Sequence, residues 1–202
     1  LEAIVEDEPR FQMALTMLSS AYCRLRRPED ALAVAQRAVE VNPDDANAHY
    51  HLGFVLEVEF HRLDEALQEY DRGIALNPKD EKCWMFRALL LQRQGDVEEA
   101  LRTIADGIDA VRPDRAFSLW FTRGDIYANL EDWDEARVSY TTAIASTGKG
   151  EPYEVLRAHL YLERAEAAME AGHYASAWED VHRIEETDGA VSAVKLDRLR
   201  RT

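Results

Sequence analysis

Apolar residues recur along this chain at the three- and four-residue spacing of one helix face. Leu15, Leu18, Tyr22 and Leu25 form one such row, and a similar row begins at Leu101. Glycine and proline are scarce, with 9 and 6 copies in 202 residues, so few positions interrupt the rows. This spacing is typical of amphipathic helices, whereas a half-buried strand alternates at every second residue. The pattern therefore predicts an all-helical chain.

A short acidic motif that ends in alanine recurs about every 35 residues, which is a period typical of helical repeat arrays. The recurring alanines are Ala31, Ala66, Ala100, Ala136 and Ala177. Apolar rows of helical spacing lie both before and after each alanine. We therefore expect each repeat unit to consist of two helices.

Proline supplies a second landmark with the same period. Pro43 and Pro78 each follow an asparagine. Because proline disfavours the α conformation in the residue before it and donates no backbone hydrogen bond, the two Asn-Pro pairs are predicted to end helices. Pro28 suits a first helical turn. Asp96 and Asp132, each three residues before a glutamate, resemble capping boxes that start helices.

The residues between these landmarks resemble the tetratricopeptide repeat. That family carries an aromatic residue, Leu-Gly and Tyr on a first helix, then Ala, an aromatic residue and Pro on a second. The fourth unit matches best, with Trp120, Gly124 and Tyr127 before Ala136 and Tyr140. The resemblance implies an all-α, right-handed superhelical solenoid of about five helix-turn-helix repeats with a C-terminal capping helix. We expect a single array over residues 1–202, with units at about 11–45, 46–80, 81–116, 117–150 and 151–187 and the capping helix at 190–201.

Small residues are expected where the two helices of a unit cross. The first helices carry one at this position, namely Ser19, Gly53, Ala88, Gly124 and Ala165. Only small side chains allow so close an approach, so we expect them to face the recurring alanines of the second helices. The last unit departs from the pattern by an insertion around 147–157. We expect it to lengthen the first helix of that unit, with Gly148 and Gly150 marking a break before it.

The balance of charge excludes some classes of partner. A net charge of −15 and a sequence pI near 4.8 would repel a phosphate backbone, so we expect no nucleic acid partner. No run approaches the roughly 18 apolar residues that cross a bilayer, which predicts no membrane insertion. Carboxylate-rich runs such as the one at Glu57 are interpreted as solvated helix faces. The chain begins at Leu1 without a signal-peptide pattern, so we expect an excised segment of a cytoplasmic protein.

No group of side chains has the spacing of a catalytic or metal site. Cys23 and Cys83 stand far apart and are interpreted as small core residues. His49 and His51 lie on different sides of a helix, so we expect no shared metal ion, and His49 is interpreted as core. The Gly-Lys-Gly at 148–150 lacks the strand and spacing of a phosphate-binding loop and is interpreted as a surface turn. We predict no enzyme activity and no cofactor.

The resemblance places a binding surface on the concave face, which the first helices line in this family. Several large apolar residues fall there at positions that the fold does not need for its own packing, and such a stripe usually marks a binding site. The predicted groove residues are Tyr50, His51, Phe54, Val58, Met85, Phe86, Leu89, Phe121, Thr122, Asp125 and Asn129. The alternative left open is that these side chains pack on one another.

The predicted function is a non-catalytic protein–protein interaction scaffold that holds a partner peptide or helix in the groove of its second to fourth units. Family members that clamp a chaperone tail use Lys, Asn and Arg on three first helices. The residues at those positions are Thr16, Ser20, His51, Lys82 and Phe86, of which only Lys82 matches. An apolar helix or extended segment is therefore the expected ligand. Two rivals remain, a self-assembling homo-oligomer and the regulatory or targeting domain of a larger enzyme.

Overall fold

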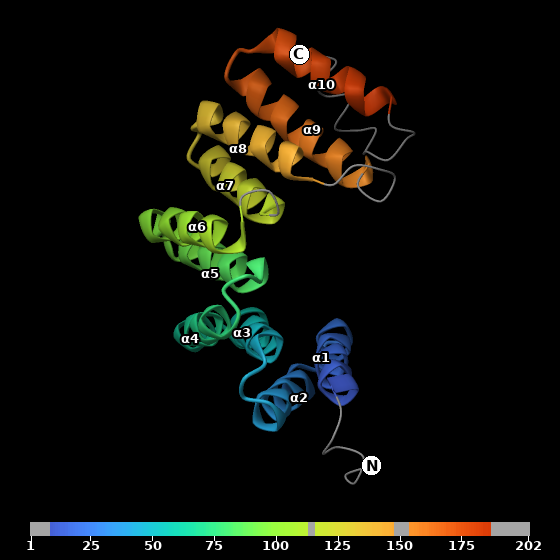
Figure 1. The fold of residues 1–202 in the computed structure, drawn as a ribbon, viewed down its shortest axis with the longest axis vertical. Helices are drawn as coiled ribbons and strands as arrows, with labels where there is room; N and C mark the ends of the chain where they lie inside the picture. Colours follow the sequence, from blue (N-terminus) through green and yellow to red (C-terminus); the bar gives the residue numbers. More distant parts are fainter. Residues whose placement is uncertain (1–8, 113–115, 148–153, 187–202) are drawn as a thin grey trace. The chain divides into compact units, whose positions relative to one another are not determined.

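The computed structural model describes residues 9–112, 116–147 and 154–186, and within them it has ten helices and no strand. The prediction of an all-α fold is thus confirmed (Figure 1). The chain divides into two compact units, residues 1–96 and 97–202. Unit 1 contains α1 (Pro9–Arg24), α2 (Pro28–Val41), α3 (Ala46–Phe60), α4 (Leu63–Leu76) and α5 (Glu81–Gln94). Unit 2 contains α6 (Val97–Val111), α7 (Phe117–Asn129), α8 (Trp133–Ser146), α9 (Glu154–Glu170) and α10 (Tyr174–Glu186).

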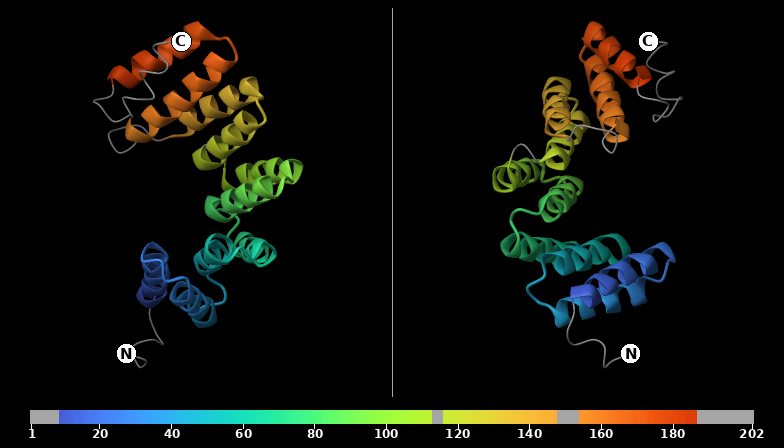
Figure 2. Two further views of the ribbon diagram at one scale, coloured as in Figure 1. Left: turned by 180° about the vertical axis from the view of Figure 1, so that it is seen from behind. Right: turned by 45° about the vertical axis from the view of Figure 1, so that its right-hand side comes forward.

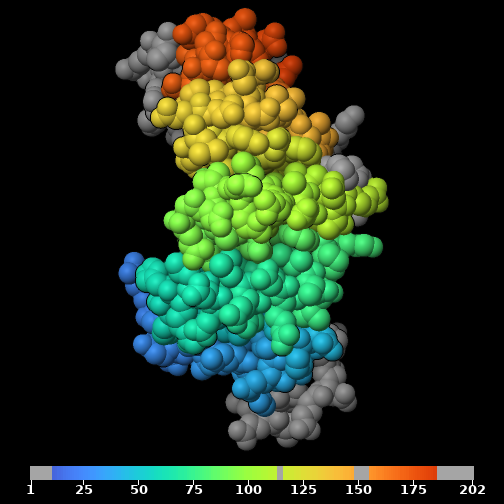
Figure 3. All heavy atoms as spheres, turned by 90° about the vertical axis from the view of Figure 1, so that its left-hand side faces the viewer, coloured from blue at the N-terminus to red at the C-terminus, as the bar shows by residue number. Residues whose placement is uncertain are grey.

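The helices of unit 1 pack in chain order. Each contacts the next, and α1 and α5 also contact α3. Their core joins Ala31 and Ala35 of α2 to Leu52 and Val55 of α3 and to Tyr70 of α4. In the space-filling view of Figure 3, side chains of α3 and α4 (cyan to green) lie closely against one another. The alanines let the helices approach, and the larger residues fill the space between them.

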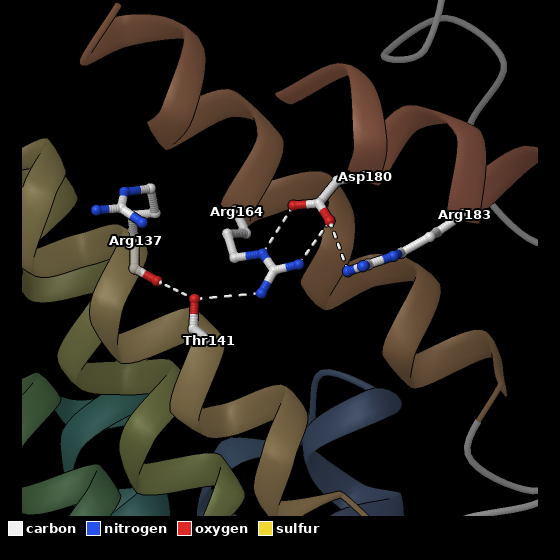
Figure 4. Close-up of polar contacts among 5 residues, drawn as sticks. All are labelled: Arg137, Thr141, Arg164, Asp180 and Arg183. Atoms are coloured by element: carbon white, nitrogen blue, oxygen red, sulfur yellow. Dashed lines mark hydrogen bonds and ion pairs between the residues drawn. The ribbon is translucent and has the colours of Figure 1, made fainter. Parts of the chain in front are cut away.

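Unit 2 follows the same scheme, with each helix from α6 to α10 packed on its neighbour in sequence. An ion pair also joins its last two helices. Arg164 of α9 donates to both carboxylate oxygens of Asp180 on α10, from Nε at 2.7 Å and from Nη2 at 2.5 Å. Figure 4 shows the same guanidinium donating to Thr141 of α8, whose hydroxyl donates in turn to the Arg137 carbonyl. Three helices of unit 2 are therefore linked through one arginine.

The helix ends agree with the landmarks in the sequence. Asn42 and Asn77 terminate α2 and α4, and each follows the last helical residue directly, so the predicted role of the Asn-Pro pairs is confirmed. Pro28 lies in the first turn of α2, as predicted. The structure adds two caps that the sequence analysis did not name. Asp45 and Asp80 accept hydrogen bonds, each from the backbone N–H two residues on, at 3.0 Å, and so start α3 and α5.

The predicted capping box of α8 forms only in part. The Asp132 carboxylate accepts from the Glu135 N–H at 3.3 Å, as an N-cap should. The Glu135 side chain pairs with Arg123 of α7 at 3.1 Å. It therefore links two helices within the pair α7/α8.

The small residues of the first helices allow a close approach to the second helices, as expected, and part of the room at the two glycines is taken by a tyrosine ring. A Cβ added at Gly53 would lie 2.7 Å from a ring carbon of Tyr70, and one at Gly124 would lie 2.4 Å from a ring carbon of Tyr140. Contacts between real Cβ atoms and carbon are longer than this. These glycines thus make room for the tyrosine four residues after the recurring alanine. The expected approach to the alanine is confirmed for Gly53, because the same Cβ would also lie 3.2 Å from the Ala66 carbonyl oxygen.

Other expectations depend on residues whose placement the structure does not give. The break at Gly148 and Gly150, the turn at 148–150 and the capping helix at 190–201 all lie outside the described residues. The first helix after the insertion, α9, is the longest described helix with 17 residues, as expected. The expectation that the array forms one continuous superhelix depends on how the two units are placed relative to each other. It stays a prediction. Across the described part of the chain, no helix combines the length and the apolar character needed to span a bilayer.

Candidate partner-binding surface

Three aromatic rings form a cluster on the first helices of unit 1. Tyr50 and Phe54 lie one turn apart on α3, and Phe86 lies on the neighbouring first helix α5. The ring centroids of Tyr50 and Phe86 are 5.1 Å apart, and those of Phe54 and Phe86 are 5.7 Å apart, both in edge-on geometry. This arrangement is favourable for aromatic pairs. All three side chains stay partly exposed, so the cluster forms part of the surface.

The three rings differ in how much they serve the fold. Tyr50 and Phe86 also pack against the buried core of unit 1 that contains Leu52 and Tyr70. Phe54 is not among the side chains that pack on that core. The alternative that the groove residues pack on one another is therefore true in part. Phe54 is the ring whose burial the fold needs least.

A cleft of about 630 Å³ lies on the same unit, between α1 and α3. His51 joins it to the aromatic cluster, because its ring packs 4.8 Å from that of Tyr50 while its Nδ1 lies 3.5 Å from the Ser20 hydroxyl. Burial, helped by the nearby charge of Lys82, lowers the pKa of His51, which favours the neutral ring. The lining residues are Thr16, Met17, Ser20, Ala21, Arg24, Leu25 and His51.

Met17 is one of the cleft residues that the sequence analysis did not assign to a binding surface. It is 65% exposed and lines the cleft beside Arg24. Its position, two residues before Ser19, is the position that His51 holds relative to Gly53. Applying to the first unit the helix positions that gave the groove residues of the later units would therefore have identified Met17.

The other predicted groove residues of unit 1 also reach the surface. Val58 is exposed on α3, and Met85 and Leu89 are partly exposed on α5. They extend the apolar surface along the same two first helices that carry the aromatic cluster.

The predicted groove residues of unit 2 lie partly in its interior. Thr122 is only 3% exposed and its hydroxyl donates to the Ser118 carbonyl, so its assignment to the groove was wrong. Phe121 packs on the cluster that contains Tyr140, and Asp125 accepts a hydrogen bond from the Tyr140 hydroxyl at 2.8 Å. Asn129 is exposed at the end of α7. A groove that continues from α5 to α7 would join two units and stays a prediction.

One carboxylate that was interpreted as solvated is buried. Glu57 of α3 is 3% exposed, accepts from the Tyr70 hydroxyl at 2.6 Å and pairs with Arg93 of α5. Burial raises the pKa of Tyr70, so the phenol keeps its proton and donates. The interpretation of Glu57 as part of a solvated face was wrong, because Tyr70 and Arg93 supply the partners that a buried carboxylate requires.

His49 is a core residue, as predicted, and both of its ring nitrogens face acceptors. Nδ1 lies 2.6 Å from a carboxylate oxygen of Glu69, and Nε2 lies 2.9 Å from the Pro43 carbonyl. The bond to Glu69, followed by the bond to Pro43, raises the pKa of His49 above its usual value, against the opposing effect of burial. A ring that donates through both nitrogens is the imidazolium form.

The folding stability is expected to fall as the pH rises through the raised pKa of His49. The folded state holds the proton more tightly than the unfolded chain, so the stabilisation is complete below the usual histidine pKa of about 6.5 and is lost above the folded value. Urea unfolding at several pH values would measure this slope. The variant His49→Gln should flatten it, whereas His61→Asn, at an exposed position, should leave it unchanged. An unchanged slope in His49→Gln would contradict the assignment.

The two cysteines are free thiols. Cys83 is buried against Gly73, and burial raises its pKa to about 12, so the core interpretation is confirmed for it. Cys23 is half-buried and packs at the edge of the core of unit 1. Within the described ranges, no three His, Cys, Asp or Glu side chains gather as a metal site would require.

Comparison with known proteins agrees with the helical-pair architecture. The family described as tetratricopeptide repeat matches residues 16–81 and 86–152. The solved structure of pilF from Pseudomonas aeruginosa is similar with a TM-score of 0.70 and 19% identity, over 94% of this chain and 83% of that one. A thermophilic tetratricopeptide repeat protein of Thermus thermophilus gives 0.65 and 24%, over 94% and 96%. YrrB, described as having an unusual peptide-binding site, gives 0.59 and 15%, over 93% and 91%. No protein with a curated description matches the chain.

These solved structures are less than 25% identical to this chain, so their similarity establishes the fold alone. The family match rests on the sequence itself and takes in all or part of each helix from α1 to α8. This fold is a scaffold for protein–protein interaction in general. The chain belongs to the tetratricopeptide repeat family.

Proposed function

We propose that the chain is a non-catalytic interaction module and that unit 1 binds a partner segment across α1, α3 and α5. The observation that carries the proposal is the partly exposed cluster of Tyr50, Phe54 and Phe86 beside an open cleft. A surface of this kind offers rigid aromatic contacts at one end and the flexible side chain of Met17 at the other. Both types are enriched where proteins bind one another.

The shape and chemistry of the surface favour an apolar helix or extended segment as the ligand. Its rings and cleft would take two or three apolar anchors, which is how helices and strands are recognised in grooves. Among the residues that line the cleft, Arg24 alone carries a fixed charge. YrrB, a tetratricopeptide repeat protein with an unusual peptide-binding site, gives this proposal a precedent within the same fold.

Replacing Phe54 with Asp is expected to weaken partner binding about tenfold or more without unfolding the protein. A charge there would be buried against the anchors of the partner, whereas in the free protein it stays partly solvated. Pull-down from an extract of the source organism, with wild-type and variant protein as baits, would identify the partner that is lost. Titration with a peptide from that partner would then give both dissociation constants.

Two further variants keep this experiment decisive. Val138→Asp changes an exposed valine of α8 in unit 2 and should leave capture unchanged. Phe86→Asp should reduce thermal stability, because that ring also packs on the core. Equal capture by wild type and Phe54→Asp would refute the proposal. Loss of helical circular dichroism in Phe54→Asp would show instead that the ring belongs to the core.

A further inference from the structure

Two cations border the proposed binding surface of unit 1 without an ion pair. Arg24, in the last turn of α1, lines the cleft, and Lys82, in the first turn of α5, lies over the Tyr50 ring with its Nζ 5.6 Å from the centroid. Both side chains are exposed, and neither is paired with a carboxylate among the described residues. Other arginines of unit 1 do pair with carboxylates, namely Arg27, Arg37, Arg62, Arg87 and Arg93. The charges of Arg24 and Lys82 therefore stay available to an external acceptor.

The carboxylates on the neighbouring helix ends do not neutralise these two cations. Asp45 and Asp80 cap α3 and α5, and each accepts a hydrogen bond from a backbone N–H. Glu57 is buried and already bound within the core of unit 1. Glu59, the other acidic residue of α3, is partly exposed and forms an ion pair with neither cation in the described part of the chain. A partner that covers this surface must therefore supply the acceptors itself.

The contacts of the surface place the two cations at opposite ends of a row of rings. Lys82 lies over Tyr50, the Tyr50 ring lies 4.8 Å from that of His51, and His51 lines the same cleft as Arg24. All three first helices of unit 1 take part, because α3 contacts both α1 and α5 (Figure 2). A segment laid along this row would meet one cation at each end and apolar side chains, Phe54 among them, in between.

We propose that the partner segment is acidic as well as apolar, with a side-chain carboxylate on either side of its apolar anchors, one for Arg24 and one for Lys82. This inference rests on the function proposed for unit 1 and adds the charge of the ligand to it. Because two rings separate the cations, two carboxylates of the segment match them better than one chain-terminal carboxylate. Opposite charges at the edge of an interface fix the register of the partner and exclude partners of like charge.

The net charge of −15 does not oppose such a ligand at contact distance. Charges in water that lie beyond about 8 Å of one another are largely screened at physiological salt, so the distant carboxylates act little on a pair in contact. An exposed ion pair changes a binding constant by about fivefold at most. The two cations therefore select among segments that the apolar anchors already hold.

Selection from a library of random peptides displayed on phage tests the charge of the ligand directly. When the peptides are joined to the phage coat by their C-termini, only side-chain carboxylates are available to the cations. The wild-type chain is expected to enrich sequences with Asp or Glu on both sides of apolar residues. The most enriched sequence, synthesised with an amidated C-terminus, then serves as the probe, and fluorescence anisotropy gives its dissociation constant.

Charge reversal in the protein should weaken binding of this probe. Arg24→Glu and Lys82→Glu are each expected to raise the dissociation constant about tenfold, because each replaces an attraction with a repulsion. Replacing the matching acidic residue of the peptide with Lys should restore most of the affinity. Lys79→Glu makes the same change of net charge in the turn before α5, and it should alter the dissociation constant less than about twofold.

Phe54→Asp separates this inference from the proposed function on which it rests. That variant should lose the probe whatever the charge of the peptide. If no peptide is enriched, or if Phe54→Asp binds the probe as tightly as wild type, the proposed function fails and the acidic ligand with it. If the enriched peptides depend on Phe54 but are neutral or basic, or if Arg24→Glu and Lys82→Glu bind the probe as wild type does, the function stands and the acidic ligand is refuted.

Discussion

Replacing Asp180 with Ala is expected to lower the unfolding free energy of unit 2 by about 3–5 kcal/mol, the usual cost of removing one partner of a buried ion pair. Asp180 is 1% exposed and receives both hydrogen bonds of the Arg164 fork. The Arg164 side chain is itself only 12% exposed, so without Asp180 its charge has little access to water. Guanidinium chloride unfolding followed by circular dichroism would measure the loss.

A double substitution separates the loss of the ion pair from the cost of leaving one charge buried. The combination of Arg164→Met with Asp180→Leu removes both charges and fills the space, so it should destabilise unit 2 less than Asp180→Ala alone. Arg183 also lies near Asp180, at 3.4 Å, but its side chain is 48% exposed. Arg183→Ala should therefore cost under about 1 kcal/mol. A loss this small in Asp180→Ala would show that Arg164 finds another partner or water.

Replacing Gly124 with Ala is expected to destabilise unit 2 by about 1–3 kcal/mol, although alanine is the better helix former by about 1 kcal/mol. The new Cβ would lie 2.4 Å from the Tyr140 ring. That ring cannot move aside freely, because its hydroxyl is bonded to Asp125 at 2.8 Å. Differential scanning calorimetry would show a lower Tm for the variant.

The partner ring provides the control for this prediction. In a Tyr140→Leu background the obstacle is removed, so the additional effect of Gly124→Ala should shrink to near zero or become stabilising. Tyr140→Leu itself will destabilise the protein, and the comparison is therefore made between single and double variants. If Gly124→Ala raises the Tm of the otherwise wild-type chain, the close approach to Tyr140 is not a constraint.

The sequence was sufficient to predict the helices and their pairing. Local rules decide where a helix ends, and the Asn-Pro pairs at Asn42 and Asn77 obey them without reference to the rest of the chain. The caps at Asp45 and Asp80 follow a local rule too, and could have been found from the same pattern. What failed were statements about which side chain meets which. Glu57 and Thr122 stand at helix positions that count as outward-facing, yet both are buried. For Glu57 the partners Tyr70 and Arg93 lie far away in the sequence.

The candidate site was predicted in outline only, because periodicity gives the face of a helix but not the side chains that it meets. Helical periodicity places Tyr50, Phe54 and Phe86 on one side of the first helices, and the structure brings their rings together. Periodicity cannot tell that Phe86 also reaches the core while Phe54 does not, because that depends on the angle between α3 and α5 and on Tyr70 beneath them.

The bonds from Tyr70 to Glu57 and from Tyr140 to Asp125 each stay within one helical pair. Apart from the Arg93 contact to Glu57, neither bond needs a neighbouring repeat to complete it. Pairs such as α3/α4 and α7/α8 are therefore each stabilised by a tyrosine–carboxylate hydrogen bond of their own. Such a unit can be duplicated, deleted or exchanged in evolution, or moved into an engineered array, with its tyrosine–carboxylate bond intact, but α3/α4 would still need a partner like Arg93 from the next repeat for its buried carboxylate.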